Sequence, residues 1–171
     1  MYTLSTHIEL PIAHRLPGAY SGLCVGNISR DETETFPKDD LGMIHGHNYN
    51  ITFKVSTNRM NEDFMVMDFK KIKKIIHAEM DKYDHSLILK EGDALIDFYK
   101  KGYSDRGIDI NKTRLYIWKE APTAEYMAYL WFNTFAELFT ENGIELSHLA
   151  VTVEETSKNS VTYEEDIKYY D

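Results

Sequence analysis

A single cysteine, Cys24, occurs among the 171 residues, and this scarcity excludes a disulfide bond within the chain. Thiols that stay unpaired are typical of reducing compartments, so the cytoplasm is the expected location. No apolar run approaches the roughly 20 residues that a membrane-spanning helix needs. Residues 1–14 alternate in polarity and lack a basic leader, which predicts a strand and not a signal peptide.

Positive charge is also scarce, because 19 Lys and Arg stand against 28 Asp and Glu, giving a formal net charge of −9. Nucleic-acid-binding proteins neutralise phosphates with Lys and Arg, so nucleic acid is not an expected partner. A few local cations would still suffice for a phosphorylated small substrate. The hydrophobic share of 43% and the charged share of 27% are typical of a globular protein. The length suits one domain over residues 1–171.

Two segments alternate between apolar and polar residues, which is the period of a half-buried strand. In residues 3–14 the apolar face ends on His14. In residues 45–55 the same face begins with His45 and His47 and continues with apolar side chains. The polar, acidic residues 26–40 between the two segments predict a long loop.

Two further segments have the apolar spacing of amphipathic helices. The first begins after Asp68, a favourable N-cap residue, and its predicted apolar stripe is Phe69, Ile72, Ile76 and Met80. The second begins after Thr123 and has Glu125 in its electropositive first turn. Its predicted stripe is Met127, Trp131, Phe135 and Leu138.

The C-terminal residues 149–167 predict a hairpin that turns at residues 157–160. Residues 92–112 are rich in Gly, Asp and Lys and predict an insertion between the helices. The resulting order, β-β-α-α-β-β, predicts an α+β protein. We expect an antiparallel four-stranded sheet with two helices on one face.

The sequence His45-Gly46-His47 places two imidazoles on one face of its strand, because residues i and i+2 point the same way. Zinc binds imidazole nitrogens with tetrahedral geometry, so a third ligand must come from elsewhere. His14 ends the neighbouring predicted strand and can supply it. Three protein ligands leave the fourth position open, as in catalytic zinc sites. A lone His-x-His is also common among ordinary histidines, and both interpretations stay open.

Asp84-His85 follows the first predicted helix, and an Asp can orient an imidazole for proton transfer. Such dipeptides are also common in loops, so the pair needs a nearby base or nucleophile. Cys24 could be that partner as a thiolate, although spacing alone favours a small, inert apolar side chain. The histidines without partners in the pattern are interpreted as ordinary ones: His7, His77 and His148.

Glu155 lies on the apolar face of a predicted strand, after Val151 and Val153. A buried carboxylate is costly unless it is paired. Glu155 therefore either meets a cation of the protein or receives a ligand that donates hydrogen bonds, such as a guanidine-like edge. The alternative is an exposed glutamate at the end of the strand.

Six short motifs follow one another along the chain: 13-AHRLPG-18, 45-HGHNY-49, 65-MVMDF-69, 84-DH-85, 122-PTAE-125 and 154-EET-156. Their order resembles that of the 6-pyruvoyl- and 6-carboxy-tetrahydropterin synthase family. The resemblance covers nearly the whole chain, and six motifs in order are hard to reach by chance. It implies the tunnelling fold, a β-β-α-α-β-β unit. It also implies homotrimers whose sheets join into a barrel, or homohexamers of two trimers, with active sites between subunits.

The resemblance implies roles for residues at three kinds of position. It implies that Zn²⁺ is held by His14, His45 and His47. It implies a catalytic dyad formed by Asp84 and His85. It implies that the pterin is bound by Thr123, Glu125 and Glu155, with Glu155 as its anchor.

The substrate that the resemblance implies is 7,8-dihydroneopterin triphosphate. Zinc would act as a Lewis acid on the side-chain hydroxyls, and a cysteine thiolate would move protons with the Asp–His pair as relay. Triphosphate is then eliminated. The carboxy branch also releases acetaldehyde and feeds deazapurine (queuosine-type) synthesis, whereas the pyruvoyl branch feeds tetrahydrobiopterin.

One departure from the family concerns its catalytic cysteine, which comes shortly before the His-Gly-His run. This chain has 39-DDLGMI-44 there, so either Cys24 supplies the thiol across an insertion near 25–44, or Asp39 or Asp40 replaces it. Cys24 is favoured, because its distance from His14 suits the carboxy branch. We therefore expect a 6-carboxytetrahydropterin synthase. The alternatives are an enzyme that forms a pyruvoyl or hydroxymethyl pterin, and a zinc- and pterin-binding protein without catalysis.

Overall fold

The computed structural model of the chain describes residues 1–16, 43–60, 62 and 64–167. The chain divides into two compact units, each built from separate stretches of sequence. The first combines Met1–Ile12, His47–His85 and Thr123–Asp171, and the second combines Ala13–Gly46 and Ser86–Pro122.

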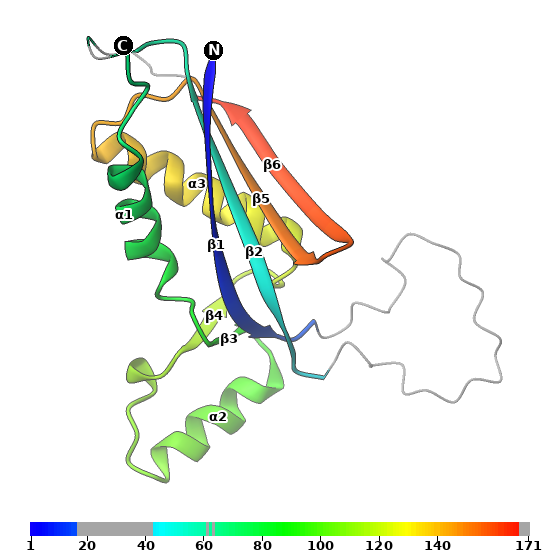
Figure 1. Ribbon diagram of the computed structural model, residues 1–171. Helices are drawn as coiled ribbons and strands as arrows, with labels where there is room; N and C mark the ends of the chain where they lie inside the picture. The colour runs from blue at the N-terminus through cyan, green and yellow to red at the C-terminus, as the bar shows by residue number, and fades with distance from the viewer. Residues whose placement is uncertain (17–42, 61, 63, 168–171) are drawn as a thin grey trace, which may run out of the picture. The chain divides into compact units, whose positions relative to one another are not determined.

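Six strands form one hydrogen-bonded sheet in the order β4-β3-β1-β2-β5-β6 (Figure 1). The long strands are β1 (Tyr2–His14), β2 (His45–Thr57), β5 (His148–Thr156) and β6 (Asn159–Asp166). Strand β5 pairs antiparallel with both β2 and β6. The arrangement agrees with the predicted α+β class, although the sheet has six strands and not the four expected.

In the first unit the core lies between the strands and two helices, α1 (Phe69–Met80) and α3 (Ala124–Glu141). Figure 1 shows both helices beside the same strands, and α3 contacts β5 and β6. The alternation predicted for β1 and β2 is confirmed, because Ile8, Leu10 and Ile12 are buried, as are Tyr49, Ile51, Phe53 and Val55. The rings of Phe53 and Phe135 meet edge to face at 4.6 Å, which joins β2 to α3.

Both predicted helix caps are present. The Asp68 side chain accepts a hydrogen bond from Lys70 N, and the Thr123 side chain accepts one from Tyr126 N. The predicted apolar stripe of α1 is wrong at Phe69, whose side chain is 47% exposed. Phe69 is the first residue of the helix, and the buried stripe begins one turn later at Ile72. In α3 the innermost C-terminal side chain is Phe139, while Leu138 is half-buried. No described helix combines the length and the apolar character that crossing a membrane requires.

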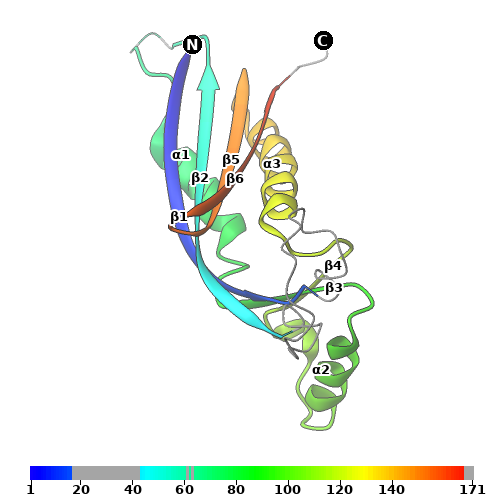
Figure 2. The ribbon, with the colours of Figure 1, turned by 90° about the vertical axis from the view of Figure 1, so that its right-hand side faces the viewer.

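In the second unit the segment predicted as an insertion contains regular structure. Strands β3 (Ser86–Lys90) and β4 (Leu115–Trp118) are parallel and flank α2 (Ala94–Ser104) and a short 3-10 helix, η2 (Ile110–Lys112). Figure 2 shows α2 beside these two short strands. Parallel strands need a crossover connection, and a helix commonly provides it. The expectation of an entirely antiparallel sheet is wrong at this pair. The helix was missed because only Ile96 of α2 is buried, which leaves a weak apolar stripe.

Candidate metal centre

Three histidines from β1 and β2 lie close enough to share one metal ion. His14 is the last residue of β1, and His45 and His47 occupy alternate positions at the start of β2. One ligand atom from each residue lies within 4.8 Å of those of the other two. His14 is fully buried, and the other two are half-buried. The strand pattern that suggested this group therefore corresponds to a real convergence of imidazoles.

Backbone carbonyls fix the orientation of two of these rings. His14 Nδ1 is 2.7 Å from the carbonyl oxygen of Pro122, and His45 Nδ1 is 3.2 Å from that of Met43. A carbonyl can only accept, so Nδ1 carries the proton and donates in both cases. In the neutral rings the lone pair then belongs to Nε2. A metal-binding histidine is typically held in this way through its other nitrogen.

Glu155 lies beside the third histidine. Its Oε1 is 3.5 Å from His47 Nε2 and accepts a hydrogen bond of 3.2 Å from the Tyr49 hydroxyl. The register of β5 and β6 shifts between Glu154 and Thr156, so Glu155 occupies an irregularity of the β-bulge type. Bulges redirect side chains and are frequent next to active sites. Glu155 is half-buried beside His47, and its role as a ligand-binding carboxylate stays a prediction.

The pKa of Tyr49 is raised far above the ordinary value of a phenol, so its hydroxyl keeps its proton even at high pH. Burial of the side chain is the main cause, and the negative charge of Glu155 and the hydrogen bond to that carboxylate add to it. An ionised phenol could not donate to Glu155. The pair therefore consists of a neutral phenol and a carboxylate.

Asp84 and His85 lie in contact, with His85 Nδ1 3.0 Å from Asp84 Oδ2. His85 has a positive φ of 54°, which is uncommon for a residue other than glycine. Its backbone N–H donates to the Pro11 carbonyl at 2.8 Å, so the strained backbone is tied to β1. The His85 side chain is 77% exposed. Strained residues of this kind concentrate at functional sites.

The PT-x-E segment begins α3. Thr123 is its N-cap, and Glu125 lies exposed in the first turn. The carbonyl of Pro122, one residue earlier, accepts from His14. The segment therefore both starts the helix and orients a candidate metal ligand, a link that the sequence did not reveal.

A buried ion pair secures the residue next to His14. Arg15 Nη1 lies 2.5 Å from Asp93 Oδ1, and the Asp93 side chain is fully buried. The same oxygen of Asp93 accepts from Leu95 N and caps α2. Removing one partner of a buried pair leaves the other charge uncompensated. Asp93, in the segment of residues 92–112, thus holds the end of β1 in place through Arg15, the residue after His14.

Three residues considered as catalytic bases lie outside the described residues: Cys24, Asp39 and Asp40. The identity of the base, a thiol or a carboxylate, therefore stays a prediction from the sequence.

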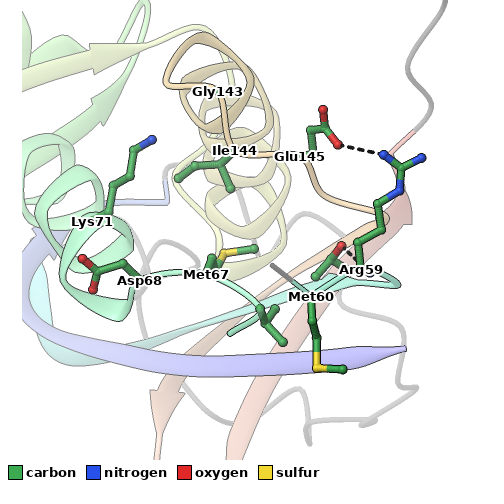
Figure 3. A pocket seen from close by; sticks show the side chains of 10 residues that line it. Arg59, Met60, Met67, Asp68, Lys71, Gly143, Ile144 and Glu145 are labelled. Atoms are coloured by element: carbon green, nitrogen blue, oxygen red, sulfur yellow. Dashed lines mark hydrogen bonds and ion pairs between the residues drawn. The ribbon is translucent and has the colours of Figure 1, made fainter. Parts of the chain in front are cut away.

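A pocket of about 390 Å³ lies in the first unit. Thr57, one of its lining residues, ends β2, whereas His47 lies near the start of that strand. Figure 3 shows Arg59 and Glu145 pointing toward each other across it, and Arg59 Nη1 is 3.5 Å from Glu145 Oε2. Lys71 Nζ donates to the Asn142 carbonyl at 2.7 Å. Because Arg59, Glu145 and Lys71 contact other groups of the chain, this pocket differs in chemistry from the histidine site.

The fold and the histidine group together define a protein of the tetrahydropterin synthase class. Residues 3–166 match the family model described as 6-pyruvoyl tetrahydropterin synthase. The chain belongs to this family, as the six motifs indicated.

Curated relatives carry the name of the carboxy branch. The chain is 25% identical over 136 residues to a 6-carboxy-5,6,7,8-tetrahydropterin synthase of Aquifex aeolicus, covering 78% of this chain and 82% of the relative. It is 28% identical over 114 residues to the protein of the same name from Rickettsia typhi, covering 66% of this chain and 78% of the relative.

Solved structures confirm the fold. An uncharacterized protein from Wolinella succinogenes matches with a TM-score of 0.67 at 16% identity, covering 95% of this chain and 97% of the other. The 6-pyruvoyl tetrahydropterin synthase of Plasmodium vivax matches with a TM-score of 0.62 at 16% identity, covering 98% of this chain and all of the other. At these identities the similarity establishes the architecture alone.

Proposed function

We propose that the chain, a member of a family of enzymes that act on pterins, is a zinc-dependent 6-carboxy-5,6,7,8-tetrahydropterin synthase. Its substrate is 7,8-dihydroneopterin triphosphate, which reacts with water to give 6-carboxytetrahydropterin, acetaldehyde and triphosphate. The observation that carries the proposal is the convergence of His14, His45 and His47 within 4.8 Å, with Glu155 beside His47.

The metal in this proposal is Zn²⁺ held by His14, His45 and His47. Three neutral imidazoles are a typical ligand set of catalytic zinc, which keeps its fourth position open. In two of the three rings Nδ1 donates to a backbone carbonyl, so the neutral ring has its lone pair on Nε2. When bound, zinc supplies Lewis-acid stabilisation of negative charge on substrate oxygens.

Glu155 is the proposed pterin anchor. Its carboxylate suits the N–H donors of the pterin ring edge, and a charge-assisted bond of this kind is stronger than a neutral one. Thr123 and Glu125 are proposed to line the same pocket through the start of α3. The nearby Pro122 carbonyl, which binds His14, is compatible with that placement.

The proton-transfer groups are proposed to be Cys24 as base, with Asp84 and His85 as relay. The 3.0 Å contact of the dyad supports the second part, because Asp84 can hold His85 in one tautomer. The high exposure of His85 leaves it accessible to substrate or to another subunit. Cys24 rests on the family resemblance and on its being the chain's one thiol.

The alternative with support is a carboxylate base. A solved Plasmodium vivax 6-pyruvoyltetrahydropterin synthase is described with a glutamate as its catalytic residue. Asp39 or Asp40, shortly before His45, could act in the same way, with a pyruvoyl or hydroxymethyl product. The names of the curated relatives favour the carboxy product. A zinc- and pterin-binding protein without turnover is the third possibility.

Product analysis separates these functions. Purified protein is incubated with 7,8-dihydroneopterin triphosphate, and acetaldehyde, triphosphate and the pterin products are quantified. The proposed function predicts equal amounts of acetaldehyde and 6-carboxytetrahydropterin. A pyruvoyl or hydroxymethyl pterin would assign the alternative enzyme, and pterin binding without any product would exclude catalysis.

The proposed function extends to the assembly, location and pathway of the protein. We infer one functional domain over residues 1–171, assembled as a homotrimer or homohexamer in the cytoplasm and serving deazapurine (queuosine-type) synthesis. An open sheet edge favours pairing with another chain. Sedimentation that found a stable, active monomer would contradict the assembly.

A further inference from the structure

Tyr49 carries a hydroxyl at a position where the core needs only an apolar ring. The residue is fully buried at the centre of the apolar face of β2. A buried hydroxyl without a partner is costly, and that of Tyr49 donates to Glu155 Oε1 at 3.2 Å. Phenylalanine would fill nearly the same space without this bond. The hydroxyl therefore has a task beyond packing.

The partner of this hydroxyl is one specific carboxylate oxygen. Glu155 Oε1 accepts from the Tyr49 hydroxyl and lies 3.5 Å from His47 Nε2, a candidate metal ligand, so the hydrogen bond from Tyr49 fixes the direction of the carboxylate. Glu155 lies at an irregularity in the register of β5 and β6, and bulges of this kind redirect a side chain. The Tyr49 hydroxyl on β2 then fixes which way the redirected carboxylate points. Preorganised binding groups lose less conformational freedom when the ligand arrives.

The ring of Tyr49 has a separate contact with the candidate metal ligand. It lies edge-on to the His47 ring, with centroids 5.5 Å apart and planes at 69°. Substituting phenylalanine keeps this ring contact and removes only the hydroxyl. The two roles of the side chain can thus be separated by a single substitution.

We infer that Tyr49 is a positioning residue whose hydroxyl orients the Glu155 carboxylate toward the N–H donors of the bound substrate. The inference rests on the proposed function, which assigns a pterin to Glu155. It predicts that the hydroxyl contributes to substrate affinity and not to metal binding.

The test compares Tyr49→Phe with Tyr163→Phe. Tyr163 also donates to a glutamate, Glu165, but on the exposed strand β6, so it controls for loss of a tyrosine–glutamate bond. Zinc content, the Kd for 7,8-dihydroneopterin measured by fluorescence, and kcat and KM with the triphosphate are determined for both. Tyr49→Phe should keep its zinc, raise Kd and KM about tenfold, and change kcat less than threefold. Tyr163→Phe should match the wild type in all four.

A double variant tests whether Tyr49 acts through Glu155. If it does, Tyr49→Phe combined with Glu155→Gln should bind the pterin no more weakly than Glu155→Gln alone. Fully additive losses, or wild-type Kd and KM in Tyr49→Phe, would overturn the inference. Wild-type protein that holds zinc but does not bind 7,8-dihydroneopterin would instead overturn the proposed function, and the inference with it.

Discussion

Two sites of this chain contain histidine, and they differ in what the ring nitrogens face. At the start of β5, His148 has a carboxylate at each nitrogen, with Nδ1 3.1 Å from Asp166 Oδ1 and Nε2 3.6 Å from Glu164 Oε2. In the candidate metal centre, His14 and His45 direct Nδ1 to backbone carbonyls. The ring nitrogens of His148 face carboxylates, whereas His14, His45 and His47 each bring one ligand atom within 4.8 Å of the other two.

The difference shows why the number of ligand-type residues does not define a metal site. Asp166 and Glu164 are mostly exposed, and their charges interact with water. His14 is fully buried, and its ring is oriented by the hydrogen bond from Nδ1 to the Pro122 carbonyl. Among the described residues, the three histidines are the group whose ligand atoms converge.

The largest expected effect concerns the metal ligands themselves. Wild-type protein should contain about one zinc per chain. His45→Ala and His47→Ala should each lose the metal and the activity, because two imidazoles seldom hold zinc. His148→Ala is the matched control and should keep both. Metal analysis after dialysis measures this, and full zinc retention in the two alanine variants would refute the site.

The next effect separates proton transfer from metal binding within the same centre. Cys24→Ala should lower kcat by about 10²–10⁴-fold, the usual contribution of a general base. Zinc content and pterin binding should be unchanged, and Asp39→Asn and Asp40→Asn should have little effect. Near wild-type turnover in Cys24→Ala, with loss in an aspartate variant, would assign a carboxylate base and move the product to the pyruvoyl or hydroxymethyl branch.

A third comparison contrasts two ion pairs with different burial. Asp93→Asn keeps a capping side chain for α2 but leaves Arg15 without its charge partner, so it should lower the unfolding free energy by about 3 kcal/mol. Glu145→Gln breaks the exposed pair with Arg59 and should cost less than about 1 kcal/mol. Denaturant unfolding of both variants measures the difference. Equal small losses would mean that the buried pair does not secure the end of β1.

The smallest effect concerns the anchor. Glu155→Gln should keep zinc and weaken pterin binding by about 1.5–3 kcal/mol, or one to two decades of affinity. Glu164→Gln, which changes a carboxylate of the His148 cluster, is the control and should bind normally. Titration with 7,8-dihydroneopterin measures both. An unchanged affinity in Glu155→Gln would make it an ordinary residue at the end of its strand.

Much of this centre could be predicted from the sequence because strands have a period of two. That period places His45 and His47 on one face and sets His14 at the end of another, so the group of three follows from local pattern. Residues that act through distant contacts left no such signal. The Pro122 carbonyl, Asp93 and the Tyr49 hydroxyl meet their partners across 108, 78 and 106 residues of sequence.

The fold also has parts that local sequence pattern predicts and parts that depend on distant contacts. The long strands and the capped helices α1 and α3 have strong apolar periodicity, and their predicted positions hold. The helix α2 buries only Ile96, and the parallel pair β3 and β4 is short, so tertiary pairing defines them more than local pattern. A side-chain role such as that of Tyr49 depends on which residue lies opposite in β5, and register between strands is not a local property.

X-ray absorption at the zinc edge of the purified wild-type protein tests the central claim most directly. The account predicts a first shell of three imidazole nitrogens at about 2.0–2.1 Å, one further light ligand, and no sulfur. His47→Ala should remove the signal. A protein without zinc, or a shell that fits without imidazole scattering, would contradict the assignment of His14, His45 and His47 as the metal centre.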